Sequence, residues 1–173
     1  MTLLDQFKAV TTFVFDMDGV LTDGSLLILD NGQFIRKMNI KDGFALQLAV
    51  KRGYRVAVIS GSVSDPAILR LNHLGIKDVF MGISNKKAKL AAYMEEHGLQ
   101  PGEVLFMGDD IPDYAVMTSI SMPCAPADAV PEIKQIARYI SPHNGGAGCV
   151  RDVVEKVLKL NQHWEVVTDI ASR

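Results

Sequence analysis

The sequence predicts an α/β fold in which a doubly wound parallel sheet lies between two layers of helices, a three-layer Rossmann-like sandwich. Short apolar runs typical of strands alternate with helical segments along most of the 173 residues, and several of those segments stop at a glycine, as at Gly53, Gly75 and Gly98. Repeated strand–helix units imply parallel strands with helices on both faces. The hydrophobic content of 48% and the charged content of 22% are ordinary for one globular domain, which we expect to span residues 1–173.

Each expected element follows from its own residues. Thr12–Phe15 is β-branched or aromatic throughout and predicts a buried strand, whereas the spacing of apolar residues predicts a helix over Gly43–Arg52. Further along the chain we expect strands at Val56–Ile59, Val79–Met81, Val104–Met107, Ser121–Ala125 and Tyr139–Ile140, and helices at Ser64–Leu74, Lys86–His97, Pro112–Ser119, Val130–Ala137 and Val150–Leu160.

One segment, residues 25–38, breaks this alternation. It predicts two strands joined at Asn31-Gly32, a pair that strongly favours a hairpin turn. Leu26–Leu29 is apolar without interruption, so both faces of the hairpin need cover. The hairpin either folds back onto its own domain or pairs with the hairpins of other subunits.

Two carboxylates follow the first strand. Asp16 and Asp18 are two residues apart and therefore point to the same side, and Gly19 permits a sharp turn after them. An Asp-x-Asp pair alone is also common in acidic surface turns. Two crowded anions are unfavourable without a cation nearby, so the pair indicates a bound metal ion.

Reactive groups also follow three later strands. Ser60 and Gly61 follow the second strand, Lys86 opens the helix after the third, and Asp109, Asp110 and Asp113 follow the strand at Val104–Met107. Ligands of open α/β sheets bind at the carboxyl ends of the strands, so all these groups are expected to meet at one edge.

The residues at these four strand ends resemble, in order and spacing, the sequence motifs of the haloacid dehalogenase superfamily of phosphatases. The closer resemblance is to the small branch without a cap domain, which includes 3-deoxy-manno-octulosonate 8-phosphate phosphatases, and it runs from about Phe7 to Leu160. It depends on residues 16–24, on Lys41-Asp42-Gly43, on Gly108-Asp109-Asp110 and on residues 145–151. It implies a phosphoric monoester hydrolase with a protruding hairpin.

The resemblance also implies roles for the residues at the strand ends. Asp16 would attack phosphorus and form an aspartyl-phosphate, while Asp18 would act as acid and then base, with a pKa raised by neighbouring anions. Ser60 and the backbone at Gly61 would bind phosphoryl oxygens, and Lys86 would pair with Asp16.

A magnesium ion is the cofactor implied by the family. Its ligands would be an oxygen of Asp16, the backbone carbonyl of Asp18 and the carboxylate of Asp109. Asp110 and Asp113 would orient water on the metal, the lysine or the start of a helix.

The expected substrate is a small-molecule sugar-acid phosphate, foremost the octulosonate 8-phosphate of lipopolysaccharide synthesis. Arg70 and His73 share a helix face that could meet the sugar acid, and Arg151 would approach the substrate when the glycine-rich tail and helix, residues 144–161, close over the site. Many relatives carry an arginine where this chain has Ser62, which keeps a nine-carbon ulosonate 9-phosphate open as substrate. A phospho-acceptor signalling module and a non-catalytic partner subunit are the alternatives from other classes.

Charge and cysteine content limit the other partners and the location. The net charge is −2 and no basic cluster occurs, so we expect neither nucleic acid nor a membrane as a partner. Cys124 and Cys149 match no metal-binding spacing, and the first residues do not resemble a signal peptide, which together favour the cytoplasm. The family implies a homo-oligomer, a tetramer assembled through the hairpins.

Overall fold

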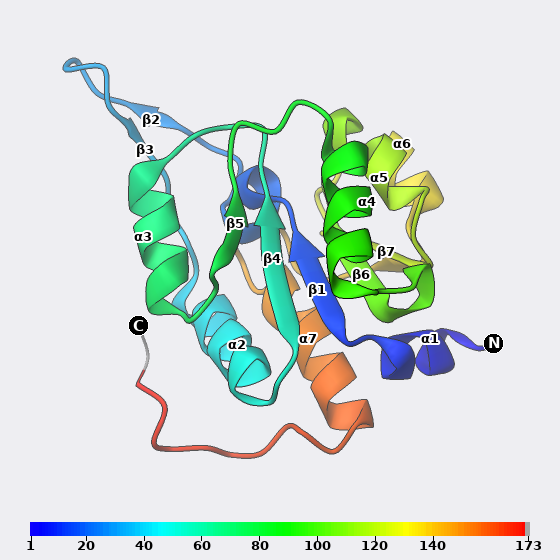
Figure 1. The fold of residues 1–173 in the computed structure, drawn as a ribbon. Helices are drawn as coiled ribbons and strands as arrows, with labels where there is room; N and C mark the ends of the chain where they lie inside the picture. The colour runs from blue at the N-terminus through cyan, green and yellow to red at the C-terminus, as the bar shows by residue number, and fades with distance from the viewer. Residues whose placement is uncertain (172–173) are drawn as a thin grey trace.

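A six-stranded parallel sheet in the order β5-β4-β1-β6-β7-β8 forms the centre of the computed structural model, which describes residues 1–171 (Figure 1). The first strand pairs with both β4 and β6, so the chain builds one half of the sheet and then returns to build the other. This arrangement confirms the predicted doubly wound sheet, and it brings the carboxyl ends of these three strands together. The strands of the sheet are β1 (Thr12–Phe15), β4 (Arg55–Ile59), β5 (Asp78–Phe80), β6 (Val104–Met107), β7 (Met122–Ala125) and β8 (Tyr139–Ile140).

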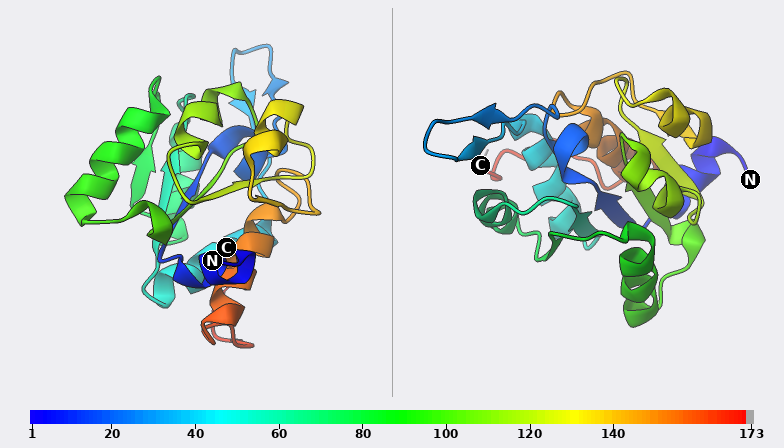
Figure 2. Two further views of the ribbon diagram at one scale, coloured as in Figure 1. Left: turned by 90° about the vertical axis from the view of Figure 1, so that its right-hand side faces the viewer. Right: turned by 90° about the horizontal axis from the view of Figure 1, so that it is seen from above.

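Helices cover both faces of the sheet (Figure 2). Alternation along β1 divides the core, because Phe13 and Phe15 belong to one buried cluster and Val14 to the other. The first cluster is closed by α1 (Leu3–Ala9), α2 (Ile40–Lys51), α3 (Asp65–His73) and α7 (Cys149–Leu160). The second is closed by α4 (Lys86–His97), α5 (Tyr114–Met117) and α6 (Pro131–Ile136), while Pro101–Glu103 and Ile111–Asp113 form short 3₁₀ turns.

Helices α1 and α2 differ from the sequence predictions. The α1 helix was not predicted, although Thr2 and Asp5 form a capping box at its start. The α2 helix begins three residues before the predicted Gly43, because the Asn39 side chain accepts the backbone N–H of Lys41 at 2.8 Å and caps it.

The hairpin consists of β2 (Leu27–Ile28) and β3 (Phe34–Ile35) and projects away from the body of the protein (Figure 1). Its turn has Gly32 at φ +82°, as the Asn-Gly pair predicts. Ile28 is 68% exposed and Phe34 is 56% exposed. The hairpin therefore does not bury its apolar side chains on its own domain, and that alternative is wrong.

The described chain has neither an inserted cap domain nor a helix that could span a membrane. The connections between the strands of the described chain consist of turns, helices of at most 12 residues and the β2–β3 hairpin, so the predicted lack of a cap domain is confirmed. Within residues 1–171, no helix has the length and apolar character needed to cross a membrane.

Candidate active site

The loop that follows β1 presents Asp16 at the edge of the sheet. One oxygen of this carboxylate, Oδ1, accepts the Met17 backbone N–H at 2.7 Å and lies 2.9 Å from Nζ of Lys86. Burial, followed by the charge of Asp113, raises the pKa of Asp16 to about 6. Both contacts fall on the same oxygen, so Oδ2 is left for a substrate or a metal.

Lys86, at the start of α4, is held between two acids. Its side chain is 5% exposed, and Nζ donates to Asp113 Oδ1 at 2.7 Å as well as meeting Asp16. Burial alone would lower the pKa of Lys86, but the charges of Asp16 and Asp113 outweigh it and raise the pKa. The lysine is therefore charged, and it neutralises part of a strongly acidic cluster.

Asp109 is the acid that most needs a further partner. Its Oδ1 is buried and accepts no hydrogen bond within residues 1–171. Burial, together with the charges of Asp16, Asp113 and Asp110, raises the pKa of Asp109 to about 8. Gly19, at φ +87°, leaves the room for this carboxylate, because a Cβ there would lie 1.9 Å from Asp109 Oδ2.

This donor set fits a hard divalent cation. Oxygens of Asp16, Asp109 and Asp113 lie within 4.8 Å of one another, and carboxylate oxygens are the ligands that Mg²⁺ prefers. Asp113 already accepts from Lys86 and from the Asp109 backbone N–H, the latter at 3.1 Å. The free oxygens therefore belong to Asp16 and Asp109, and Asp113 acts as their support.

The Asp18 side chain turns away from that cluster toward the hairpin. Arg36 binds it through two nitrogens, with Nε 2.7 Å from Oδ1 and Nη2 3.2 Å from Oδ2, and Ser62 donates to Oδ2 at 2.8 Å. Burial would raise the pKa of Asp18, but hydrogen bonds from Arg36 and Ser62 outweigh it and lower the pKa. The prediction of a raised pKa was wrong, because it considered the neighbouring anions and missed the arginine.

These groups surround a cleft of about 490 Å³. Ser60 is buried, and its hydroxyl lies 3.0 Å from that of Ser62. Gly61 also lines the cleft, although a Cβ there would only touch Ile83 O at 3.8 Å, so protein atoms do not require glycine. Asp110 lines the cleft and uses its Oδ1 to cap the backbone N–H of Ile111.

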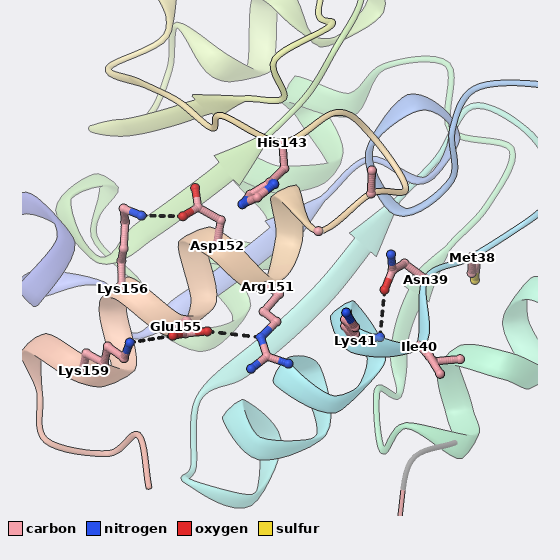
Figure 3. Close-up of a pocket in the computed structure, with 12 residues that line it drawn as sticks. Met38, Asn39, Ile40, Lys41, His143, Arg151, Asp152, Glu155, Lys156 and Lys159 are labelled. Carbon is pink, nitrogen blue, oxygen red and sulfur yellow. Dashed lines mark hydrogen bonds and ion pairs between the residues drawn. The ribbon is translucent and has the colours of Figure 1, made fainter. Parts of the chain in front are cut away.

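The three predicted substrate-binding cations lie outside this cleft. Arg70 lines a separate hollow between the hairpin and α3, while the side chain of His73 is exposed and lines neither space. Arg151 lies in a third hollow, between the start of α2 and α7, where it pairs with Glu155 (Figure 3). The assignment of these three residues to substrate binding stays a prediction.

The segment after α7, followed as far as residue 171, does not line the cleft of its own chain. It passes below α2, where the Tyr54 hydroxyl lies 2.9 Å from His163 Nδ1 and Arg52 pairs with Glu165. The tail predicted to close over the site, residues 144–161, precedes this segment, and its closure stays a prediction.

The glycines at residues 145–146 pack against the loop that carries Asp18. A Cβ on Gly145 would lie 1.9 Å from Gly19 O, and Gly146 N donates to Val20 O at 2.9 Å. The nearby Asp42 accepts the Arg151 backbone N–H at 2.7 Å and so caps α7, whose preceding Gly148 has no side chain to do so. Residues 145–151 and Asp42 were part of the family resemblance, but the sequence alone did not show that the glycines support the acidic loop or that Asp42 caps α7.

The fold and the cleft define a class, and comparison with known proteins agrees. Residues 70–152 match the family described as haloacid dehalogenase-like hydrolase. A curated relative from Salmonella typhi, 3-deoxy-D-manno-octulosonate 8-phosphate phosphatase KdsC, is 32% identical over 156 residues, which cover 90% of this chain and 83% of the relative.

Solved structures of such phosphatases are also similar to this chain. That of the Yersinia pestis enzyme has a TM-score of 0.93 at 28% identity and covers 97% of this chain and 91% of its own. That of the Moraxella catarrhalis enzyme, in complex with magnesium ion, phosphate ion and KDO, has a TM-score of 0.88 at 27% identity, with 91% and 90% covered. The chain belongs to the haloacid dehalogenase-like hydrolases, in the branch formed by the KdsC phosphatases.

Proposed function

We propose that this chain is a Mg²⁺-dependent phosphatase that converts 3-deoxy-D-manno-octulosonate 8-phosphate to the free sugar acid and phosphate. The observation that carries the proposal is the pairing of Asp16 with buried Lys86 beside Asp109, whose Oδ1 has no partner in the described chain. The printed names of the relatives supply the substrate class.

In the first step, Asp16 attacks phosphorus and the bond to the sugar oxygen breaks. The product is an aspartyl-phosphate, and the departing oxygen takes a proton from Asp18. Lys86 and the Ser60 hydroxyl stabilise charge on the phosphoryl oxygens. Because hydrogen bonds from Arg36 and Ser62 lower the pKa of Asp18 despite its burial, this proton transfer is favoured when Arg36 takes another partner.

In the second step, Asp18 accepts a proton from water, which attacks phosphorus and releases phosphate from Asp16. The Arg36 and Ser62 contacts suit this step, since they keep the carboxylate ionised and oriented. A magnesium ion held by Asp16, Asp109 and the Asp18 backbone carbonyl would reduce the repulsion between these acids and the incoming phosphate dianion. Asp110 and Asp113 orient that arrangement from outside.

We also propose a homo-oligomer, a tetramer, that works in the cytoplasm. The support is the hairpin, whose apolar residues are exposed on both strands: Leu26, Leu27, Ile28, Phe34 and Ile35. Pairing of hairpins from several subunits would bury these side chains and protect the strand edges. A fully active monomer in solution would contradict the need for assembly.

The deciding experiment measures phosphate release with Mg²⁺ from octulosonate 8-phosphate, nonulosonate 9-phosphates and simple sugar phosphates, with Asp16→Asn as control. A kcat/KM at least ~100-fold higher for the octulosonate, roughly 2.7 kcal/mol of transition-state discrimination, would identify it as the substrate. The same preference for a nine-carbon acid would identify that acid as the substrate. It is the alternative because this chain has Ser62 where many relatives carry an arginine. A long-lived aspartyl-phosphate would favour a signalling module instead.

A further inference from the structure

We propose that Arg36 is a specificity-determining residue that binds the carboxylate of the substrate and supplies, from the hairpin, the cation that Ser62 does not provide. This inference rests on the proposed function, because it concerns how the same cleft distinguishes a sugar acid from a neutral sugar.

The position of Arg36 beside Ser62 is the first argument. Both side chains contact the same oxygen, Asp18 Oδ2, the serine at 2.8 Å and the arginine at 3.2 Å. The guanidinium therefore lies next to the Ser62 hydroxyl, where the hairpin meets the loop after β4. It arrives there from the far end of β3, 26 residues earlier in the chain.

The second argument is the charge of the cleft. Its lining contains five carboxylates, Asp16, Asp18, Asp109, Asp110 and Asp113. Lys86 is the one cation among the lining residues, and it is already engaged by Asp16 and Asp113. A substrate with a carboxylate in addition to its phosphate would meet strong repulsion here, so a second cation at the mouth is needed.

The third argument is the unused capacity of Arg36. A guanidinium has five N–H donors in a fixed plane, and only Nε and Nη2 are bound to Asp18. The side chain is 10% exposed, which strengthens its charge-assisted hydrogen bonds. Arg36 can therefore hold a second carboxylate beside Asp18, or exchange one carboxylate for the other.

The surroundings of Arg36 provide room for the rest of the sugar acid. Arg36 lines a hollow of about 720 Å³ between the hairpin and α3, together with Arg70 and apolar side chains such as Phe34 and Val63. Asp18 lines the cleft and is bonded to Arg36, so this ion pair stands between the two spaces. A phosphoryl group next to Asp16 would leave the other end of the substrate directed past Arg36.

The test compares octulosonate 8-phosphate with its C1 carboxamide, which differs only in the loss of the carboxylate charge. We expect Arg36→Met to lower kcat/KM for the acid by roughly 10- to 100-fold more than for the amide, with the extra loss mainly in KM, whereas any loss shared by both substrates reports the contact of Arg36 with Asp18. The matched control is Lys37→Met, because Lys37 is the next residue of the hairpin but pairs with Asp23 and is 79% exposed. That variant should leave both values unchanged.

Two results would overturn the proposal. An equal loss on acid and amide would mean that Arg36 acts only by holding Asp18, and no loss on either would mean that the contact is incidental. Thermal unfolding of each variant excludes misfolding, and if Arg36→Met does not fold, Arg36→Lys must show a selective, smaller loss on the acid. Failure of the proposed function is recognised separately, because the unmodified protein would then release no phosphate from octulosonate 8-phosphate beyond the rate of Asp16→Asn.

Discussion

Magnesium binding should be strongly pH-dependent, and the magnitude follows from Asp109. In the metal-free protein its pKa is about 8, since the carboxyl is buried among other acids. A metal ion binds the ionised form, so the proton competes with it and affinity rises with pH. At pH 7 roughly nine in ten Asp109 carboxyls carry a proton, so binding should release about 0.9 proton, at an affinity about 11-fold below the high-pH limit.

Asp16 extends this dependence to lower pH. Because its pKa is about 6, protonation of Asp16 lowers the Mg²⁺ affinity by a further factor of roughly two at pH 6. Together the two carboxyls make the affinity at pH 6 about 200-fold lower than at high pH. Calorimetric titration with Mg²⁺ between pH 6 and 9, in buffers of different ionisation enthalpy, measures both the affinity and the number of protons released.

A variant and a control sharpen this measurement. Asp110→Asn removes one of the charges that raise the pKa of Asp109, so the curve should move to lower pH. Asp30→Asn, at the hairpin turn, should leave the curve in place. A constant affinity from pH 6 to 9 without proton release would refute the reasoning, because Asp109 would then be ionised before the metal arrives.

Three further predictions concern the supports of the site. Gly19→Ala should displace Asp109, since the new Cβ would lie 1.9 Å from its Oδ2, and should lower kcat/KM by about 100-fold with weaker Mg²⁺ activation in steady-state assays. Burial raises the pKa of Asp42 to about 6 in the folded protein, above the unfolded value, so its ionisation destabilises the fold as pH rises. Relative to Asp42→Asn, the natural protein should lose about 2 kcal/mol of unfolding free energy between pH 4 and 7 in urea unfolding, and an equal pH dependence of the two proteins would contradict this. Ile28→Lys should dissociate the oligomer, and light scattering that still finds the full assembly would exclude the hairpin as its interface.

The strands and the main acidic groups were accessible from the sequence because their signals are local. β1 and β6 have the bounds that their apolar runs predict. In a parallel sheet the strand ends meet at one edge, so the convergence of Asp16, Ser60 and Asp109 needed no further information. The α1 helix also had a local signal in its capping box, which the prediction did not use.

The contact of Arg36 with Asp18 had no such signal. The two residues are 18 positions apart, and their approach depends on the direction in which the hairpin leaves the domain. An isolated bridge between Thr22 and Met38 fixes that direction by joining the two ends of the hairpin segment. This is tertiary geometry, so neither residue periodicity nor turn chemistry reveals it, and the sign of the pKa shift on Asp18 was missed for the same reason.

The hairpin therefore links the proposed subunit assembly to the proposed acid–base residue, two features that the sequence alone does not connect. Its outer part carries the exposed apolar side chains that we propose to be buried by other subunits, whereas its inner end places Arg36 against Asp18. The bridge between Thr22 and Met38 closes the base of the hairpin just beyond Arg36, and Thr22 itself donates to Asp18 Oδ1 at 3.3 Å. Any movement of the hairpin on assembly would reach Asp18 through these two short connections. In a protein without a cap domain, the subunit association that we propose would in this way adjust Asp18, the proposed acid–base group, without covering the site with an inserted domain.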